Sequence, residues 1–228
     1  LYAMRSSWAP ALIKHTVPEE ELLAKKKFCN FVVSNDYSNK RNEFFAALNA
    51  HRPVDSGGGY MNNIGGPVTD KLAFQRGYKF SIAYENSRGS GYCTEKIVDA
   101  FAAATVPIYW GAPDVKQEFN PAAFLCADDY PDTAALIAAI DAIDRDDEKF
   151  LAMCHAPILA PDGSSRAARY VTDEACAEFL TGIFEKGPHL RRNRSCWGSI
   201  YEGDWKYYRR LAEADQKPKG LLQRILGR

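Results

Sequence analysis

The sequence lacks several features that would assign it to a common class of protein. Its 228 residues contain no apolar run approaching the roughly 18 residues that a membrane-spanning helix needs, and they contain no secretory leader pattern. The phosphate-binding motif GxxxxGK[ST] is absent, which excludes a P-loop NTPase at the level of motif. We therefore expect a soluble globular protein, and the composition of 46% apolar and 25% charged residues is typical of one.

Cysteine and histidine are arranged in a way that disfavours a zinc site. The chain has four histidines and no Cys-x-x-Cys pair, and its six cysteines are scattered at positions 29, 93, 126, 154, 176 and 196. Such spacing is typical of reduced, mostly buried thiols in a cytoplasmic protein. We expect no metal site from these residues.

Charge is balanced over the whole chain but not along it. Lys and Arg number 29, as do Asp and Glu, yet residues 186–228 carry eleven basic and four acidic side chains. This basic C-terminal tail is also rich in Trp and Tyr and ends in the amphipathic segment LLQRILGR. We expect peripheral contact with the inner face of a membrane, with packing against a missing N-terminal half as an equal alternative and RNA binding as a weaker one.

Three segments are expected along the chain. Residues 1–27 resemble an incoming connector, residues 28–185 an α/β domain, and residues 186–228 the tail already described. The first residue is Leu rather than Met, so we expect a fragment whose N-terminal part is missing.

The stretch from Tyr78 to Asp114, YKFSIAYENSRGSGYCTEKIVDAFAAATVPIYWGAPD, predicts a strand, a loop, a helix and a second strand. Residues 79–84 and 105–110 are apolar and β-branched, as strands are, and residues 86–91 are turn formers. Apolar residues at helical spacing follow Thr94, which we expect to cap the helix. This order is that of a βαβ unit.

In a βαβ unit the loop and the helix N-terminus lie at the carboxyl edge of a parallel sheet, where anions bind readily. The polar and aromatic residues expected there are Tyr84, Asn86, Arg88, Tyr92, Thr94, Glu95 and Lys96. A lysine in the first turn of a helix opposes the helix dipole, so a bound anion would explain Lys96. A solvent-exposed lysine is the alternative.

A second cation is expected at the same edge. Residues 28–34 predict a buried strand and residues 41–48 a helix, so Arg41 stands in the first turn after a strand and could grip a phosphate. A solvated arginine at a helix end is the alternative. The glycine-rich residues 54–66 suit either close approach to a ligand or a mobile surface loop.

The other expected elements are a helix at 19–27, a strand at 122–127 and a helix at 132–143. A further helix capped by Thr172 places an apolar stripe in the core, made of Cys176, Phe179, Leu180, Ile183 and Phe184. Residues 144–146 form a nominal Asp-x-Asp pair, which we interpret as part of a solvated charged face rather than a metal site.

Taken together, these motifs resemble the donor-binding signature of the α-1,3/4-fucosyltransferases of glycosyltransferase family 10, in its bacterial form. That signature is a strand ending in [FY]-E-N, a short loop, Y-x-T-E-K, a helix and a VPIYWG strand. The segments FCNFVVSN, RNEFF, GGG and EFNPAAF also resemble the family, so the resemblance covers roughly residues 28–155. It implies a Rossmann-like parallel sheet flanked by helices, the C-terminal half of a GT-B glycosyltransferase, followed by a helical aromatic and basic tail.

The resemblance also implies a reaction. The donor would be GDP-fucose, and fucose would pass with inversion to a hydroxyl of an N-acetylglucosamine-containing glycan in α-1,3/4 linkage, as in lipopolysaccharide or protein glycosylation. No metal would be obligatory, and nucleic acid would not be a partner. The donor-binding residues would be Arg41, Tyr84, Asn86, Tyr92, Thr94 and Lys96, with Glu95 as the catalytic residue close to the fucose.

In the family the general base is expected from a carboxylate of the N-terminal acceptor domain, and the sequence shows no match to that domain. We therefore expect this chain to bind GDP-fucose yet to transfer fucose poorly. Two rival functions remain. One is a nucleotide-sugar-binding module without catalysis. The other is an NAD-dependent oxidoreductase, because Gly89-Ser90-Gly91 follows a strand and Asp114 lies at the distance of a ribose-binding acid.

Overall fold

The computed structural model describes residue 12 and residues 17–185, and the chain divides into two compact units after Cys176. The first unit is built on a parallel sheet of five strands in the order β2-β1-β3-β4-β5. The strands are β1 (Lys27–Phe31), β2 (Val54–Ser56), β3 (Tyr78–Tyr84), β4 (Val106–Trp110) and β5 (Leu125–Cys126). The predicted Rossmann-like sheet is confirmed.

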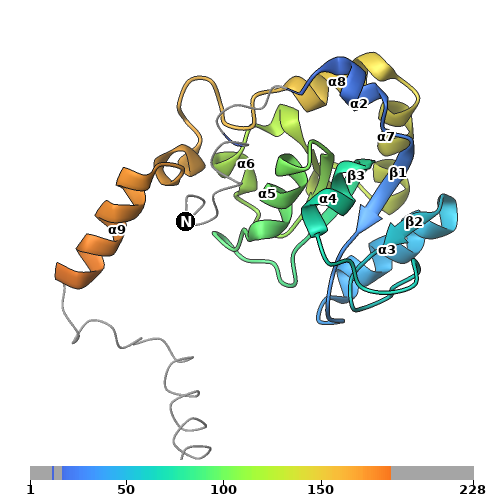
Figure 1. Cartoon of the computed structure of the whole chain (residues 1–228), viewed down its shortest axis with the longest axis horizontal. Coiled ribbons are helices and arrows are strands. Elements are labelled where there is room, and N and C mark those ends of the chain that lie inside the picture. The colour runs from blue at the N-terminus through green and yellow to red at the C-terminus, as the bar shows by residue number, and fades with distance from the viewer. Residues whose placement is uncertain (1–11, 13–16, 186–228) are drawn as a thin grey trace, which may run out of the picture. The chain divides into compact units, whose positions relative to one another are not determined.

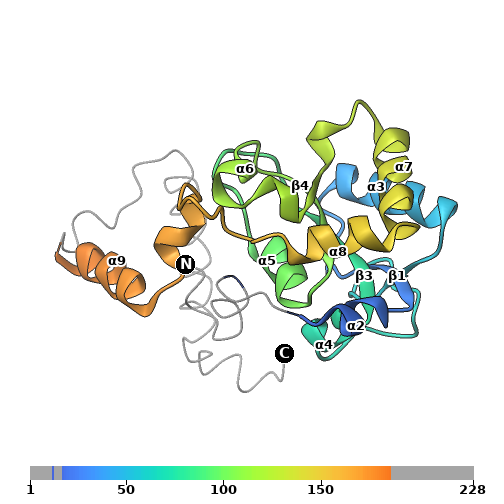
Figure 2. The ribbon, with the colours of Figure 1, turned by 90° about the horizontal axis from the view of Figure 1, so that it is seen from above.

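Helices cover both faces of this sheet (Figure 1). The helices of the first unit are α2 (Glu19–Leu23), α3 (Asn39–His51), α4 (Lys71–Arg76), α5 (Glu95–Ala102), α6 (Val115–Glu118), α7 (Thr133–Asp144) and α8 (Asp147–His155). The last described helix, α9 (Asp173–Glu185), runs into the second unit. Short 3-10 helices occur at Pro121–Ala123, Ala127–Asp129 and Arg166–Tyr170. Figure 2 shows α3 and α7 on one side of the strands and α4 and α5 on the other.

Alternation along β3 explains why the domain has two cores. Phe80, Ile82 and Tyr84 point to the face that α3, α7 and α8 cover, where they join one apolar cluster. Ala83 points to the opposite face and joins a second cluster with Tyr109 and the apolar side of α5. Because side chains alternate along a strand, the single sequence YKFSIAY supplies both layers.

The strand order reverses between β1 and β3. The chain passes from β1 outward to β2 through α3, and from β3 in the other direction to β4 through α5. Since right-handed crossovers in opposite directions place their helices on opposite faces, the loops that precede α3 and α5 diverge at this point. Open α/β sheets bind ligands in the crevice that such divergence creates.

Several predicted elements have different bounds in the structure. The strand predicted at 122–127 is reduced to the two residues of β5, flanked by 3-10 turns, and the helix predicted at 19–27 ends at Leu23. Strand β2 was not predicted and lies at the start of the glycine-rich segment. A strand of three residues is too short for alternation to reveal it.

Helix α9 begins where predicted, and Thr172 Oγ1 accepts a hydrogen bond from the Ala175 N–H at 3.2 Å. Its apolar side chains are not core residues, however, because no residue of α9 is buried. Phe179 is 48% exposed and Phe184 is 78% exposed. The prediction of core positions was therefore wrong for this helix, since helical spacing predicts an apolar stripe but not what covers it.

Other expectations can be compared with the described part of the chain. The five cysteines within it are free thiols, and Cys29, Cys126 and Cys154 are buried. None of the helices within residues 17–185 has the length and apolar character needed to span a bilayer. The expectations for the tail at 186–228 and for most of the connector fall on residues that the structure does not describe.

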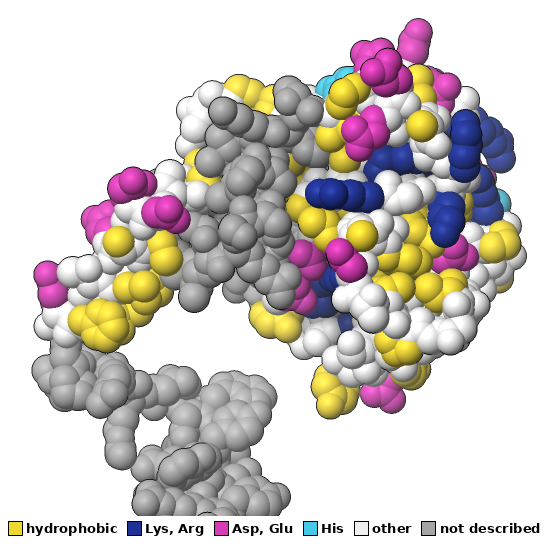
Figure 3. Space-filling model, viewed as in Figure 1, with side chains coloured by type: hydrophobic (Ala, Val, Ile, Leu, Met, Phe, Trp, Pro, Cys, Tyr) yellow, Lys and Arg dark blue, Asp and Glu magenta, His cyan; other side chains and the backbone are white. Residues whose placement is uncertain are grey.

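The amino edge of the sheet carries a buried lysine next to an acidic helix. Lys25 Nζ donates to the backbone oxygens of Arg76 at 2.8 Å, Tyr78 at 3.2 Å and Ala103 at 3.1 Å. Burial lowers the pKa of Lys25 to about 8. The charge of Glu21, in the acidic first turn of α2, acts in the opposite sense. Acidic side chains gather at the top of the view in Figure 3, where Figure 1 labels α2 and α8. This acidic patch therefore lies at the edge opposite the crevice.

Lys25 makes the stability of the fold depend on pH. Between pH 8 and the ordinary lysine pKa of 10.5 the native protein binds fewer protons at Lys25 than the unfolded chain does, so its contribution to stability rises with pH. The wild type should therefore gain up to ~3 kcal/mol of unfolding free energy relative to Lys25→Met between pH 8 and pH 10.5. Urea unfolding at several pH values measures it. The exposed Lys26→Met is the control, and a difference that stays constant with pH would contradict the assignment.

Candidate active site

A buried arginine crosses the crevice between the two diverging loops. Arg41 is the third residue of α3, and its N–H donates to Ser38 Oγ, the cap of that helix, at 3.4 Å. Its guanidinium donates to the backbone oxygen of Asn35 at 2.6 Å and to the side-chain oxygen of Asn86. Asn35 precedes α3 and Asn86 precedes α5, so one side chain joins both loops.

Arg41 forms no direct ion pair with a carboxylate of the described residues. Its side-chain partners are neutral oxygens, it forms no ion pair with any residue that the structure describes, and its Nε is buried without a partner. The residue is only 1% exposed. Burial lowers the pKa of the guanidinium, and the charge of Glu85 partly offsets this. A buried cation with spare hydrogen-bonding capacity is suited to an anionic ligand.

The second predicted cation, Lys96, lies at the same edge but has a protein partner. Its Nζ is 2.9 Å from Glu85 Oε2 and 2.9 Å from Thr94 Oγ1. Glu85 has no exposed surface, and it also accepts hydrogen bonds from the N–H and the hydroxyl of Thr94, each at 2.7 Å. Thr94 occupies the N-cap position of α5, as predicted, but its side chain makes no capping hydrogen bond because it bonds to Glu85 instead.

Sequence reasoning did not single out Glu85, which organises the start of α5. A signal was available, because a carboxylate directly after a buried strand needs partners at that strand's end. Room for its side chain comes from Gly111, just after β4. A Cβ atom there would lie 2.4 Å from Glu85 Cγ and 2.8 Å from the Tyr109 hydroxyl.

Glu95 begins α5 beside Lys96 and is accessible. Its side chain is 44% exposed, and its carboxylate lies 3.5 Å from Lys96 Nζ. Burial acts to raise the pKa of Glu95, but the charge of Lys96 and an N–H of the helix lower it below the ordinary value. Glu95 thus presents a carboxylate rather than a carboxylic acid at neutral pH. Tyr92, two residues before the helix cap, is 39% exposed.

Tyr84 lies apart from these residues. Its ring points to the opposite face of the sheet from Lys96 and stacks on Phe44 with 4.6 Å between ring centroids. The residue is 2% exposed. The structure therefore brings together Arg41, Asn86, Thr94, Glu95 and Lys96, and it separates Tyr84 from them by the alternation of β3.

The glycine run approaches backbone rather than a ligand. A Cβ atom on Gly58 would lie 1.8 Å from the carbonyl oxygen of Val33, just after β1. The loop is closed by Asn63, whose side chain accepts from the Ser56 N–H at 2.7 Å and donates to the Val54 oxygen at 2.9 Å. The glycines therefore let this loop pack against the end of β1, which the sequence analysis had not proposed.

Asp114 anchors the loop that follows β3. It accepts hydrogen bonds from the Gly91 N–H at 2.9 Å, the Ser90 hydroxyl at 2.7 Å and the Arg166 guanidinium at 2.7 Å. These three donors hold the pKa of Asp114 well below its ordinary value, and the Gly91 N–H has the largest effect, followed by Arg166 and then Ser90. An acid with this set of partners is not free to bind a ribose, so the rival oxidoreductase function loses its ribose-binding residue.

The nominal Asp-x-Asp pair is also accounted for by protein contacts. Asp144 pairs with Arg52 and, at 3.2 Å, with Lys79, while Asp146 caps α8 through the Lys149 N–H at 3.1 Å. Within the described residues, no group of three or more His, Cys, Asp or Glu side chains is arranged to hold a metal. The two aspartates stabilise the fold.

Glu85→Gln should lower the unfolding free energy by ~2 to 4 kcal/mol, because an amide nitrogen cannot accept from Thr94 or balance Lys96. Chemical denaturation measures the loss. Glu43→Gln, on the exposed side of α3, is the matched control and should change stability by less than ~0.5 kcal/mol. Equal effects of the two substitutions would show that Glu85 does not anchor α5.

Asp114→Asn should loosen the loop after β3 without unfolding the domain. The substitution removes the charge that holds Arg166 and weakens the bond to the Gly91 N–H, so hydrogen exchange of that amide should accelerate by about 10-fold. Asp162→Asn alters an exposed aspartate that accepts only from Ser164 among the described bonds, and it should leave Gly91 exchange unchanged. Unaltered exchange in Asp114→Asn would rule out the anchoring role.

Comparison with known proteins identifies the family. Residues 22–155 match the model of glycosyltransferase family 10 (fucosyltransferase), C-terminal part. The chain is 35% identical over 170 residues to an α-(1,3)-fucosyltransferase of Helicobacter pylori, covering 74% of this chain and 36% of that protein. It is 35% identical over 129 residues to α-(1,3)-fucosyltransferase 4 of the mouse, covering 55% of this chain and 30% of that protein.

Solved structures agree with this assignment. A crystal structure of an α1,3-fucosyltransferase with GDP-fucose matches with a TM-score of 0.64 at 34% identity, over 73% of this chain and 52% of that one. A crystal structure of an α1,3-fucosyltransferase with GDP matches with a TM-score of 0.66 at 33% identity, over 75% of this chain and 53% of that one. The chain thus spans about a third of the curated relatives and about half of the solved chains. It belongs to glycosyltransferase family 10, the fucosyltransferases, and matches the C-terminal part of that family.

Proposed function

We propose that the crevice between β1 and β3 binds GDP-fucose, and that this chain is the donor-binding half of an inverting α-1,3/4-fucosyltransferase. The observation that carries the proposal is the buried guanidinium of Arg41, which forms no direct ion pair among the described residues, at the same edge of the sheet as the ammonium of Lys96. A nucleoside diphosphate supplies the negative charge that this pair of cations suits. The likeness to a fucosyltransferase structure with GDP-fucose supports the choice of donor.

The proposed roles follow from where charge develops. Breaking the bond between C1 of fucose and the diphosphate leaves negative charge on the departing GDP, which Arg41, Lys96 and the N-terminus of α5 would stabilise. The sugar becomes positively charged at the same moment, and the carboxylate of Glu95 would stabilise it. Asn86 and Tyr92 would orient the donor. No step of this scheme requires a metal.

The acceptor hydroxyl must lose a proton, and we assign that role to a carboxylate of an N-terminal domain. A binding module without catalysis is the second candidate function for this chain, because it spans only part of its relatives. Single-turnover assays with GDP-fucose and N-acetyllactosamine, comparing this chain with a full-length relative, separate the two. Transfer by this chain at the rate of the relative would contradict the proposal that the base lies elsewhere.

Titration with GDP, UDP and NAD tests the class of ligand. We expect heat of binding with GDP and little with NAD. Preference for NAD would restore the oxidoreductase function that the contacts of Asp114 disfavour.

Lys96→Ala should weaken GDP binding by ~2 to 4 kcal/mol and leave guanosine binding nearly unchanged, because only GDP carries the charge that Lys96 would balance. Isothermal titration measures both affinities. Lys116→Ala removes a surface lysine that pairs with Asp129, and it should alter neither affinity. Equal weakening of GDP and guanosine binding would point to a disturbed fold instead.

A further inference from the structure

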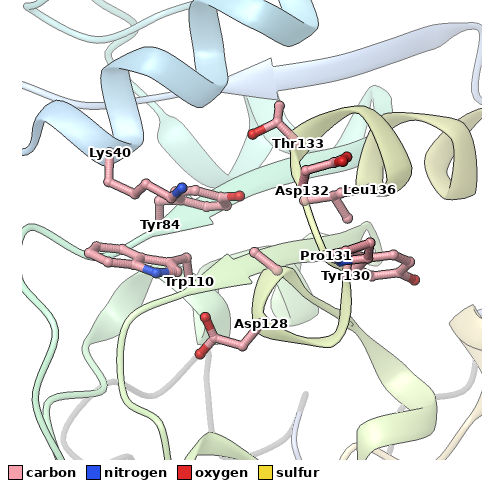
Figure 4. Close-up of a pocket in the computed structure, with 10 residues that line it drawn as sticks. Lys40, Tyr84, Trp110, Asp128, Tyr130, Pro131, Asp132, Thr133 and Leu136 are labelled. Atoms are coloured by element: carbon pink, nitrogen blue, oxygen red, sulfur yellow. The ribbon is translucent and has the colours of Figure 1, made fainter.

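A hollow of about 200 Å³ opens at the carboxyl ends of β3, β4 and β5. Figure 4 shows the rings of Tyr84 and Trp110 on one side of it and the segment from Tyr130 to Leu136 on the other. The hollow lies on the face covered by α3 and α7, whereas Lys96 lies on the face covered by α5. It is therefore distinct from the crevice that Arg41 crosses.

One wall of the hollow is flat, apolar and held in place. The ring of Tyr84 is stacked on Phe44 at 4.6 Å and 12°, and it lies 6.0 Å from the Trp110 ring. Trp110 and Tyr130 are partly exposed, so apolar ring surface remains accessible in the hollow. Aromatic surface with fixed side chains is suited to the C–H face of a pyranose, which is flat and apolar.

The polar groups of the hollow are the carboxylates of Asp128 and Asp132, the ammonium of Lys40 and the hydroxyl of Thr133, which together offer acceptors and donors to sugar hydroxyl groups. Asp128 is positioned by Arg88, whose guanidinium lies 2.5 Å from its carboxylate. Asp132 caps α7 with one carboxylate oxygen, which accepts from the Ala135 N–H at 2.8 Å, and its other oxygen forms no described bond. Carboxylates accept strong hydrogen bonds from sugar hydroxyls. Because Lys40 and Arg88 offset the charges of the two aspartates, the hollow has no excess of positive charge for a second nucleotide, and its lining favours a neutral polyol.

The hollow lies next to the crevice, because residues that line the one are sequence neighbours of residues in the other. Tyr84 is followed directly by Glu85 and Asn86, and Lys40, which also lines the hollow, is followed by Arg41. A sugar ring in the hollow would therefore lie next to the position proposed for the diphosphate. Fucose of the donor has been assigned a position beside Glu95, which begins α5 on the other face of the sheet, so the occupant of the hollow would be a different sugar.

We propose that this hollow is a subsite for one neutral pyranose ring of the acceptor glycan, contributed by the donor-binding half of the enzyme. The proposal rests on the proposed fucosyltransferase function. Trp110 and Tyr130 contact the ring face, and Asp128 and Asp132 accept from its hydroxyls.

Saturation-transfer NMR on the 228-residue chain tests this, with N-acetyllactosamine and L-fucose as separate probes at about 10 mM and with GDP titrated in parallel. We expect the wild type to bind the disaccharide. Trp110→Leu should weaken that binding about 10-fold and Asp128→Asn about 3-fold or more, with the GDP affinity unchanged. Asp129→Asn, at a neighbouring aspartate that pairs with Lys116, is the matched control and should bind both ligands as the wild type does.

The outcomes separate the two proposals. Loss of disaccharide binding in the hollow variants with intact GDP binding supports the acceptor subsite. No disaccharide binding by the wild type, or equal binding by Trp110→Leu, overturns the subsite and leaves the donor proposal standing. If Trp110→Leu and Asp128→Asn lose the saturation-transfer signal of L-fucose but keep that of the disaccharide, the assignment to the acceptor is overturned. Absence of GDP binding in the wild type overturns the donor proposal and, with it, the acceptor role of the hollow. Should Trp110→Leu fail to fold, Asp128→Asn decides.

Discussion

The hydrogen bonds of one buried guanidinium join the two loops on which the rest of the site depends. Because the sheet reverses its strand order between β1 and β3, the loops before α3 and α5 leave in opposite directions, and Arg41 reaches from one to the other. Its neutral partners fix its position without cancelling its charge. The native state thus carries a buried cation that costs stability until an anion arrives, as is common at binding sites. An anionic ligand would therefore stabilise the fold as well as occupy the site.

Arg41 and Lys96 are held in different ways. Lys96 shares a hydrogen-bonded group with Glu85 and Thr94, so its position is fixed by a carboxylate that also reduces its net attraction for anions. Arg41 retains its full charge but has little freedom to move. Lys96 is thus the cation whose position a carboxylate fixes, and Arg41 is the cation that attracts an anion more strongly. This division suits a site where charge must be stabilised at one defined point, because the donors are oriented before the charge appears.

The sequence predicted the parallel sheet, the central βαβ unit and the position of Arg41 at the sheet edge where α5 begins, because each follows from local periodicity and from the shared carboxyl edge of parallel strands. The contact itself is with Asn86, in the loop before α5. Glu85 was missed because its environment depends on Gly111, which adjoins it only in the folded sheet. The face of the sheet to which Tyr84 points could have been predicted from alternation along β3, because Tyr84 and Ala83 must point to opposite faces. The exposure of Phe184 could not have been predicted, since helical spacing does not identify a partner.

The anchor between Asp114 and Arg166 has a consequence for where the folding unit ends. The family match stops at residue 155, yet the second apolar cluster includes Ile158, Ala167 and Val171. The Ile158 carbonyl also accepts from the Asn120 N–H at 2.8 Å. A polypeptide that ended at residue 155 would lack these contacts, and Asp114, which anchors the loop between β3 and α5, would lose the hydrogen bond from Arg166. The folding unit therefore extends beyond the residues that match the family model, to the 3-10 turn that carries Arg166.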